Sequence, residues 1–246
     1  MGFAVIGFAA DRKMDWDMGI GIRILGRGVR GRSSPYGLAV LPIQVLAFFA
    51  LLSWALPARA ADMPPRLLVL GDSLTSGYGL AAQDAFPAKL EAALRARGHD
   101  IDVVDSGVSG DTTAGGRARL PWAMAEPPRW VILELGANDG LRGLPPKDTE
   151  INLDAIIIEL KRRRIAVLLA GMRAPPNLGR EYGQAFDALY PRLAKVHNIS
   201  LYPFFLDGVA GERVLNQNDG LHPNAKGVEA IVERILPHVL KLIGRS

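Results

Sequence analysis

Short apolar runs alternate along residues 66–243 with segments in which apolar side chains recur every three or four positions. The apolar runs predict β-strands at residues 66–71, 101–104, 130–135, 165–170 and 201–205. The helical spacing predicts α-helices at residues 86–97, 114–124, 149–163, 180–196 and 223–243. Strands that alternate with helices are typical of βαβ units, so the pattern predicts an α/β fold in which helices cover both faces of a parallel sheet.

The first 60 residues follow a different pattern and are set apart from this fold. Residues 38–56 form a 19-residue run without charge, which follows four arginines and precedes Pro57-Ala58-Arg59-Ala60-Ala61. A basic flank, an apolar core and an Ala-x-Ala ending predict a secretory signal peptide that is cleaved near Ala60. The alternative is a retained membrane anchor from Leu38 to Leu56. Cleavage would make the protein periplasmic or secreted, without a stable membrane partner, and residues 61–246 would form one domain.

Charge and cysteine content narrow the functional classes. The chain has 29 Lys and Arg against 25 Asp and Glu, but the excess lies in the first 60 residues, which hold seven basic and three acidic side chains. The remainder is neutral, which argues against a nucleic-acid partner. The chain has no cysteine, which excludes disulfides and thiolate metal sites, and we expect neither a metal nor a cofactor.

Ser73 lies where the first predicted strand ends. The run Leu67-Leu68-Val69-Leu70 stops at Gly71, and Asp72-Ser73-Leu74 follows. In open parallel sheets, ligands bind outside the carboxyl ends of the strands, so a hydroxyl at this place is a candidate nucleophile. A serine in such a turn commonly does no more than cap the following helix, so Ser73 needs a base and an acid from elsewhere in the chain.

Asp219 and His222 supply these partners just before the last predicted helix. They are three residues apart across Gly220, a spacing that lets the carboxylate accept a hydrogen bond from imidazole Nδ1 while Nε2 faces a serine. The predicted catalytic set is therefore Ser73, Asp219 and His222. The plainer alternative is a loop histidine that bonds to a turn aspartate.

Acyl transfer also needs donors for the oxyanion that develops in the transition state. The natural candidates are the Ser73 amide, the Gly110 amide and the Asn138 side-chain NH₂, because each follows a predicted strand end. Gly110 and Asn138 have an alternative reading as turn residues.

The chain resembles the GDSL or SGNH hydrolases in four blocks that occur in the family's order. These blocks are Gly71-Asp72-Ser73-Leu74, Gly107-x-Ser109-Gly110-x-Thr112, Gly136-x-Asn138-Asp139 and Asp219-x-x-His222. The resemblance extends over nearly all of residues 66–243 and is greatest to the exported thioesterase I, lysophospholipase and arylesterase branch. It implies a three-layer α/β/α fold with a five-stranded parallel sheet in the order 2-1-3-4-5. It also implies that Ser73 is the nucleophile and that Ser73, Gly110 and Asn138 form the oxyanion hole. One departure is Asp105, where relatives commonly carry asparagine.

The acyl side of the site is predicted in two loops rich in Leu, Pro and Met. Residues 141–146 and 172–178 suit an apolar chain better than a sugar, and the resemblance implies that such loops flank an acyl groove, which makes Leu141, Met172 and Pro175 candidate substrate contacts. The expected substrates are small-molecule or lipid esters and thioesters with an apolar acyl or aryl group. A carbohydrate O-acetyl esterase on the same fold is the alternative.

Two rival interpretations concern other residues of the same loops. Gly77-x-Gly79-x-x-Ala82 fits a relaxed dinucleotide-binding pattern, but that pattern needs its first glycine directly at the strand end, and Ser73 lies before it. Ser109 is a second candidate nucleophile, which separate alanine substitutions at Ser73 and Ser109 would distinguish.

Overall fold

The structure, a computed structural model, describes residues 63–244 of the 246-residue chain. The predicted signal peptide, its cleavage near Ala60 and the alternative anchor all fall on residues outside this range. Across the described part of the chain, no helix is both long and apolar enough to span a membrane.

Five parallel strands form one sheet in the order β2-β1-β3-β4-β5. Their bounds are Arg66–Gly71 for β1, Asp102–Gly107 for β2, Trp130–Glu134 for β3, Ala166–Ala170 for β4 and Ser200–Tyr202 for β5. This sheet confirms the predicted α/β fold and its strand order.

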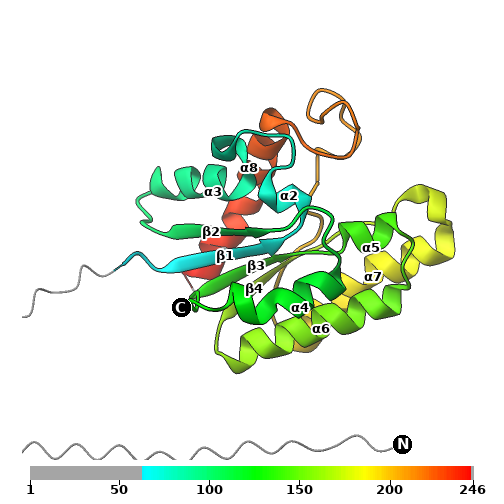
Figure 1. Cartoon of the computed structure of the whole chain (residues 1–246), viewed down its shortest axis with the longest axis horizontal. Helices are drawn as coiled ribbons and strands as arrows, with labels where there is room; N and C mark the ends of the chain where they lie inside the picture. Colours follow the sequence, from blue (N-terminus) through cyan, green and yellow to red (C-terminus); the bar gives the residue numbers. More distant parts are fainter. Residues whose placement is uncertain (1–62, 245–246) are drawn as a thin grey trace, which may run out of the picture. The chain divides into compact units, whose positions relative to one another are not determined.

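Helices connect the strands and cover the sheet. The α-helices are α2 (Ser73–Ser76), α3 (Phe86–Arg95), α4 (Thr113–Ala123), α5 (Ala137–Leu141), α6 (Pro146–Arg162), α7 (Arg180–His197) and α8 (Ala225–Ile243), and two short 3₁₀ helices are η1 (Ala82–Asp84) and η2 (Pro176–Leu178). Figure 1 shows α3 and α8 on one face of the sheet and α4, α6 and α7 on the other. The described residues therefore form three layers, helix on sheet on helix.

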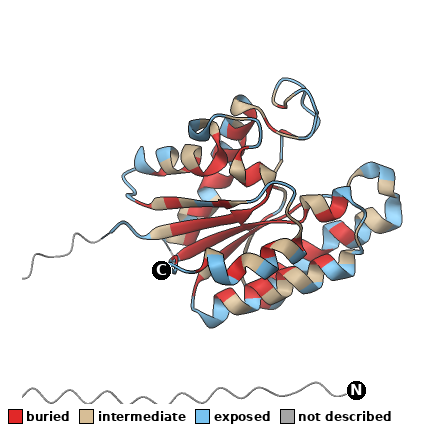
Figure 2. Cartoon of the chain, in the orientation of Figure 1, coloured by how far each residue is buried: buried red, intermediate tan, exposed pale blue. Residues whose placement is uncertain are grey.

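The core lies on both faces of the sheet, as Figure 2 shows by the continuous burial of the central strands. In β1 the side chains from Leu67 to Leu70 are at most 3% exposed, because helices cover both sides of this strand. The closing helix α8 buries Val228, Ile231, Val232 and Ile235, which share one face at helical spacing. Each such side chain contributes about 1.5–3 kcal/mol on full burial.

Two strand predictions were wrong by three residues at their carboxyl ends. We predicted that β2 ends at Val104, but it continues to Gly107, because its backbone pairs with β1 in register through Asp105 and Ser106 despite their polar side chains. We predicted a fifth strand to residue 205, but β5 ends at Tyr202. Pro203 has no N–H to donate to a ladder, which explains this early end.

Two helices also start at residues other than those predicted. Helix α6 begins at Pro146 rather than at residue 149, because a proline suits the first turn, where its missing N–H has no partner in any case. Helix α8 begins at Ala225 rather than at residue 223, because the Asn224 side chain caps it by accepting a hydrogen bond from Gly227 N at 3.1 Å.

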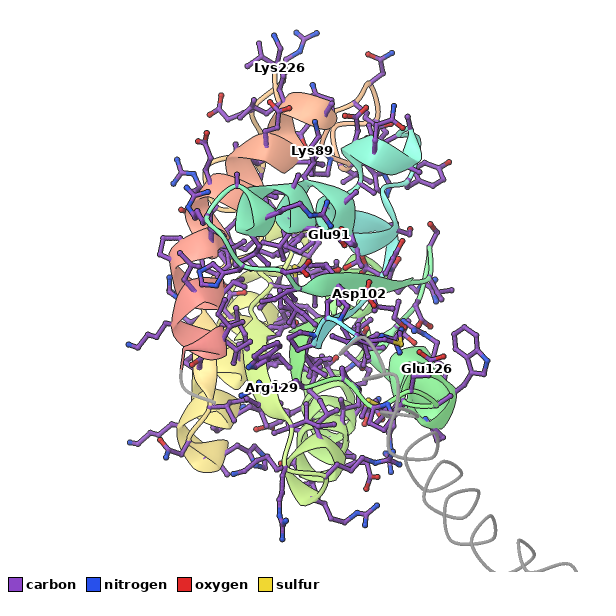
Figure 3. The ribbon with its side chains drawn as sticks, turned by 90° about the vertical axis from the view of Figure 1, so that its left-hand side faces the viewer. Lys89, Glu91, Asp102, Glu126, Arg129 and Lys226 are labelled. Atoms are coloured by element: carbon purple, nitrogen blue, oxygen red, sulfur yellow. The ribbon has the colours of Figure 1, made fainter. Side chains whose placement is uncertain are left out.

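Charged side chains lie where the strands begin, whereas the loops of the candidate site start where the strands end. Figure 3 looks onto the side where the strands begin, and Asp102, Glu126 and Arg129 lie there at the starts of β2 and β3. Arg66, the first residue of β1, pairs with Asp102 at 3.1 Å and also with Glu126. At the opposite edge Gly71 is level with Gly107 and with Glu134. The loops that follow β1, β2 and β3 therefore start side by side at that edge.

Candidate active site

Ser73, His222 and Asp219 form a continuous hydrogen-bonded chain at the carboxyl edge of the sheet. His222 Nε2 lies 3.0 Å from Ser73 Oγ, and His222 Nδ1 lies 2.7 Å from Asp219 Oδ2. Ser73 is the first residue of α2, directly after β1, whereas His222 and Asp219 lie in the loop before α8. The fold thus brings together residues that are 149 positions apart.

The ionisation of Asp219 determines which atoms donate and which accept in these hydrogen bonds. Asp219 Oδ1 accepts hydrogen bonds from the backbone amides of His222 at 3.0 Å and Leu221 at 2.9 Å. The His222 amide, the His222 side chain and the Leu221 amide lower the pKa of Asp219 to about 2. An ionised carboxylate only accepts, so Nδ1 is the donor of the imidazole and Nε2 is free to accept the Ser73 proton.

Asp72 holds the side chain of Asn138. Asn138 Nδ2 donates to Asp72 Oδ2 at 3.0 Å, and Asp72 Oδ1 accepts from Leu74 N at 3.0 Å. Asp72 is completely buried, and burial raises its pKa to about 6 in spite of these two hydrogen bonds. An amide has two N–H donors, so Asn138 retains one for another acceptor beside Ser73.

A second buried carboxyl lies beneath the turn that carries Ser73. Glu134 Oε2 accepts from Thr75 Oγ1 at 2.6 Å and from Asp72 N at 3.3 Å. Burial, with the nearby charge of Asp72, raises the pKa of Glu134 well above its usual value. A Cβ at Gly71 would lie 2.0 Å from Thr75 Oγ1 and 2.3 Å from Glu134 Oε2, so only glycine fits there.

Gly110 lies in the loop between β2 and α4, in a left-handed conformation with φ of +81°. A Cβ there would meet nothing closer than 3.7 Å, so glycine is favoured by backbone conformation rather than by lack of space. Its carbonyl accepts a hydrogen bond from Arg142 Nη2 at 2.7 Å. This hydrogen bond holds the peptide group between Gly110 and Asp111.

Arg119 of α4 joins the ends of β1 and β2 to the loop that follows β2. Its Nε donates to Asp111 Oδ2 at 2.6 Å, its Nη1 to Ser106 Oγ at 2.9 Å and its Nη2 to Gly71 O at 2.8 Å. The side chains of Arg119 and Asp111 are only 16% and 12% exposed. The guanidinium therefore joins the segment before Ser73 to the residue after Gly110.

An apolar cavity of about 330 Å³ opens beside Ser73 and His222. Leu141, Met172 and Pro175, the predicted substrate contacts, all line it, together with Phe204 and Leu206. Arg173 is the charged residue of its wall, and the guanidinium lies 4.8 Å from the centre of the Phe204 ring. The shape and lining suit an acyl chain or an aryl group better than a sugar.

The predicted site residues therefore lie around one place, whereas the rival residues do not form a comparable centre. Ser109 Oγ lies 3.2 Å from Ser76 Oγ, and it is Ser73 that approaches His222. Gly77 ends α2 rather than β1, so a dinucleotide loop is not formed there. Asp105, the departure from the family pattern, accepts a hydrogen bond from Gly107 N at 2.8 Å and so closes the end of β2.

Three residues of the site were missed by the sequence analysis: Glu134, Arg119 and Arg142. Arg119 is the clearest case, because its hydrogen bond to Gly71 joins residues 48 positions apart. The one available signal was a pair of arginines, Arg117 and Arg119, within a helix of otherwise mostly small and apolar residues. Within residues 63–244 there is no group of three or more His, Cys, Asp or Glu side chains placed to hold a metal ion.

Comparison with known proteins places this geometry in a family. Residues 69–230 match the GDSL-like Lipase/Acylhydrolase family. The chain is 43% identical over 202 residues to Thioesterase 1/protease 1/lysophospholipase L1 of Escherichia coli K12, which covers 82% of this chain and 94% of that protein. It is 38% identical over 200 residues to Arylesterase of Vibrio mimicus, covering 81% and 97% of the two chains.

A solved structure agrees with these sequence relatives. AlinE4, a SGNH-hydrolase family esterase, superposes with a TM-score of 0.63 at 46% identity, and the match covers 74% of this chain and 98% of AlinE4. The family match spans most of the chain, and the relatives are matched over nearly their whole length. The chain therefore belongs to the GDSL-like lipase/acylhydrolase family and is an ester hydrolase.

Proposed function

We propose that this enzyme hydrolyses carboxylic esters and thioesters with an apolar acyl or aryl group through an acyl-enzyme on Ser73. The observation that carries the proposal is the hydrogen-bonded chain from Asp219 through His222 to Ser73 at the mouth of an apolar cavity. A nucleophile, a base and an orienting acid in this order are the arrangement that acyl transfer by a serine requires.

In the first half of the reaction Ser73 Oγ attacks the acyl carbon while its proton moves to His222 Nε2. Asp219 holds the imidazole in the tautomer that accepts this proton and stabilises the imidazolium. Collapse of the tetrahedral intermediate breaks the bond to the leaving oxygen or sulfur, which takes the proton from Nε2. In the second half water attacks the acyl carbon and passes a proton to Nε2. Collapse of the second tetrahedral intermediate breaks the bond between the acyl carbon and Ser73 Oγ, which takes the proton back from Nε2, and the acid is released.

The oxyanion of the tetrahedral intermediate needs donors that are fixed in advance. We assign this role to the amides of Ser73 and Gly110 and to the free N–H of Asn138. The contact of Asp72 with Asn138 supports the assignment, because it holds the Asn138 amide in one orientation. A fixed donor pays no reorganisation when charge develops.

The apolar lining supports an acyl chain of medium length over an acetyl group on a sugar. The cavity walls contributed by Leu141, Met172 and Pro175 offer few hydrogen-bond partners for sugar hydroxyls. The test is a series of p-nitrophenyl esters from acetyl to dodecanoyl, measured with an acyl-CoA, a lysophospholipid and an acetylated sugar. Hydrolysis of hexanoyl to dodecanoyl esters that disappears in Ser73→Ala supports the proposal; a preference for the acetylated sugar refutes the substrate class.

We also propose that the enzyme is exported. The charge pattern of residues 1–60 supports cleavage after Ala60 and a periplasmic or secreted enzyme. Sequencing of the mature amino terminus tests it: a start at Ala61 is expected, and an intact segment in the membrane fraction would favour the anchor.

A further inference from the structure

Tyr78 places an aromatic ring directly against the catalytic imidazole. The ring centres of Tyr78 and His222 are 4.7 Å apart, and the planes are tilted by 38°. Tyr78 is nevertheless 54% exposed. One side of its ring therefore contacts the base, and the rest faces solvent at the site.

The backbone of Tyr78 is anchored on both sides of the site. Tyr78 N donates to Ser73 O at 3.1 Å, and Tyr78 O accepts from Gln217 Nε2 at 2.7 Å. Gln217 lies in the loop of His222, and Gln217 N donates to His222 O at 2.7 Å. Because these contacts fix its backbone against both the nucleophile turn and the histidine loop, the exposed ring is a positioned surface rather than a loose side chain.

Tyr78 lies outside the apolar cavity. That cavity reaches Ser73 and His222 along Leu221 and Leu206, and Tyr78 is not part of its wall. The acyl carbon carries both the acyl chain and the leaving group, so an acyl chain in the cavity directs the leaving group away from it. The leaving atom must also stay within reach of His222 Nε2, which protonates it. The Tyr78 ring contacts His222 and lies outside the cavity wall, so it borders a surface that meets both conditions.

The neighbouring loop approaches the turn before Tyr78 and exposes an apolar side chain. Ser76 Oγ lies 3.2 Å from Ser109 Oγ, which joins the turn before Tyr78 to the loop that carries Gly110. Val108, next to Ser109, is 45% exposed. Tyr78 and Val108 are both uncharged, and an aromatic face binds flat rings by stacking.

We propose that Tyr78 is the leaving-group platform of this enzyme and gives it a preference for esters of flat aromatic alcohols. This proposal rests on the proposed function and deepens it, because it assigns the side of the site opposite to the acyl cavity. It differs from a purely structural role, in which Tyr78 would only orient His222. An orienting role would affect every substrate equally, whereas a platform affects only those with an aromatic leaving group.

The test compares two hexanoyl esters whose leaving groups have similar acidity, 2-naphthyl and hexafluoroisopropyl. Both form the same acyl-enzyme, so a difference in kcat/KM between them reports the leaving group alone. In Tyr78→Ala and Tyr78→Leu, the ratio of kcat/KM for the naphthyl ester to kcat/KM for the fluoroalkyl ester should fall by about 2- to 12-fold, the range of one aromatic contact, because any change in His222 affects both esters alike. Tyr78→Phe should retain the preference.

Trp122→Ala is the matched control, because Trp122 is 75% exposed on α4 and lines a different hollow, beside Arg66 and Glu126. It should change neither ester. Equal losses for both esters in Tyr78→Ala and Tyr78→Leu, or no loss in either, would overturn the platform. A wild-type enzyme that hydrolyses neither ester, or a Ser73→Ala variant that remains active, would instead contradict the proposed function.

Discussion

Replacement of Arg119 by methionine removes the cation that joins the loops around Ser73 while it keeps a side chain of similar length. The change deletes three hydrogen bonds, to Asp111, Ser106 and Gly71, and leaves the Asp111 carboxylate without its partner. Removal of one member of a buried ion pair costs about 3–5 kcal/mol. The two side chains retain 16% and 12% exposure, so we expect the lower end, about 3 kcal/mol.

A loss of this size is measurable in a thermal or urea unfolding experiment. For a domain of this length, about 3 kcal/mol corresponds to a fall in Tm of roughly 6–12 °C. The double variant Arg119→Met/Asp111→Asn should recover about 1–2 kcal/mol, because it no longer buries an unpaired charge. The kcat of Arg119→Met should fall by more than the fraction of unfolded enzyme accounts for, with little change in KM. The reason is that Gly71 and Asp111, which lose their partner, lie beside Ser73 and Gly110 in the chain.

Arg117→Met is the control on the same helix. Arg117 is exposed and donates to Asn152 at 3.3 Å, so its replacement should change the free energy of unfolding by less than about 0.5 kcal/mol. If Arg119→Met is no less stable than Arg117→Met, the buried contacts of Arg119 contribute nothing and the reasoning is wrong.

Three further predictions concern the catalytic residues and the buried acid. Asp219→Asn should lower kcat by up to about 10⁴, because an amide no longer selects the His222 tautomer that accepts a proton; unchanged kcat would remove Asp219 from the mechanism. Asn138→Ala should lower kcat by about 10² to 10³ with little change in KM, the loss of one oxyanion donor in a steady-state assay. Folding raises the pKa of Glu134 above its usual value of 4.5, so the folded chain holds this proton more tightly than the unfolded chain. The protonated Glu134 therefore stabilises the fold fully below pH 4.5, and this stabilisation is lost as pH rises through the raised pKa. The Tm of the wild type minus the Tm of Glu134→Gln should therefore decrease as pH rises from 4.5. A difference that does not change with pH would disprove this prediction.

The sequence predicts features of this site that are local in the chain. Asp219 and His222 are three residues apart, so their hydrogen bond follows from a short loop, and Ser73 follows directly from the end of an apolar strand. The alternation of strands and helices was sufficient for the fold class. The strand order depended on the resemblance of four short blocks, because it is not encoded in spacing alone, whereas the oxyanion candidates followed from their places after predicted strand ends.

The features that the sequence did not predict depend on contacts between distant segments. Thr75 and Glu134 are 59 residues apart, and nothing near either one signals a shared buried hydrogen bond. The polar residues Asp105 and Ser106 lie within β2 because the neighbouring strand supplies a ladder, which overrides their weak strand propensity. Tyr78 is one exposed aromatic in a loop, and only the fold places its ring against His222.

The most direct test of the account is the identity of the side chain that becomes acylated. Treatment with a p-nitrophenyl alkylphosphonate, followed by peptide mapping by mass spectrometry, marks the nucleophile with a stable adduct. We expect the adduct on Ser73 in the wild-type enzyme and its loss in His222→Ala. An adduct on Ser109 or Ser76, or equal modification of Ser73 without His222, would contradict the account.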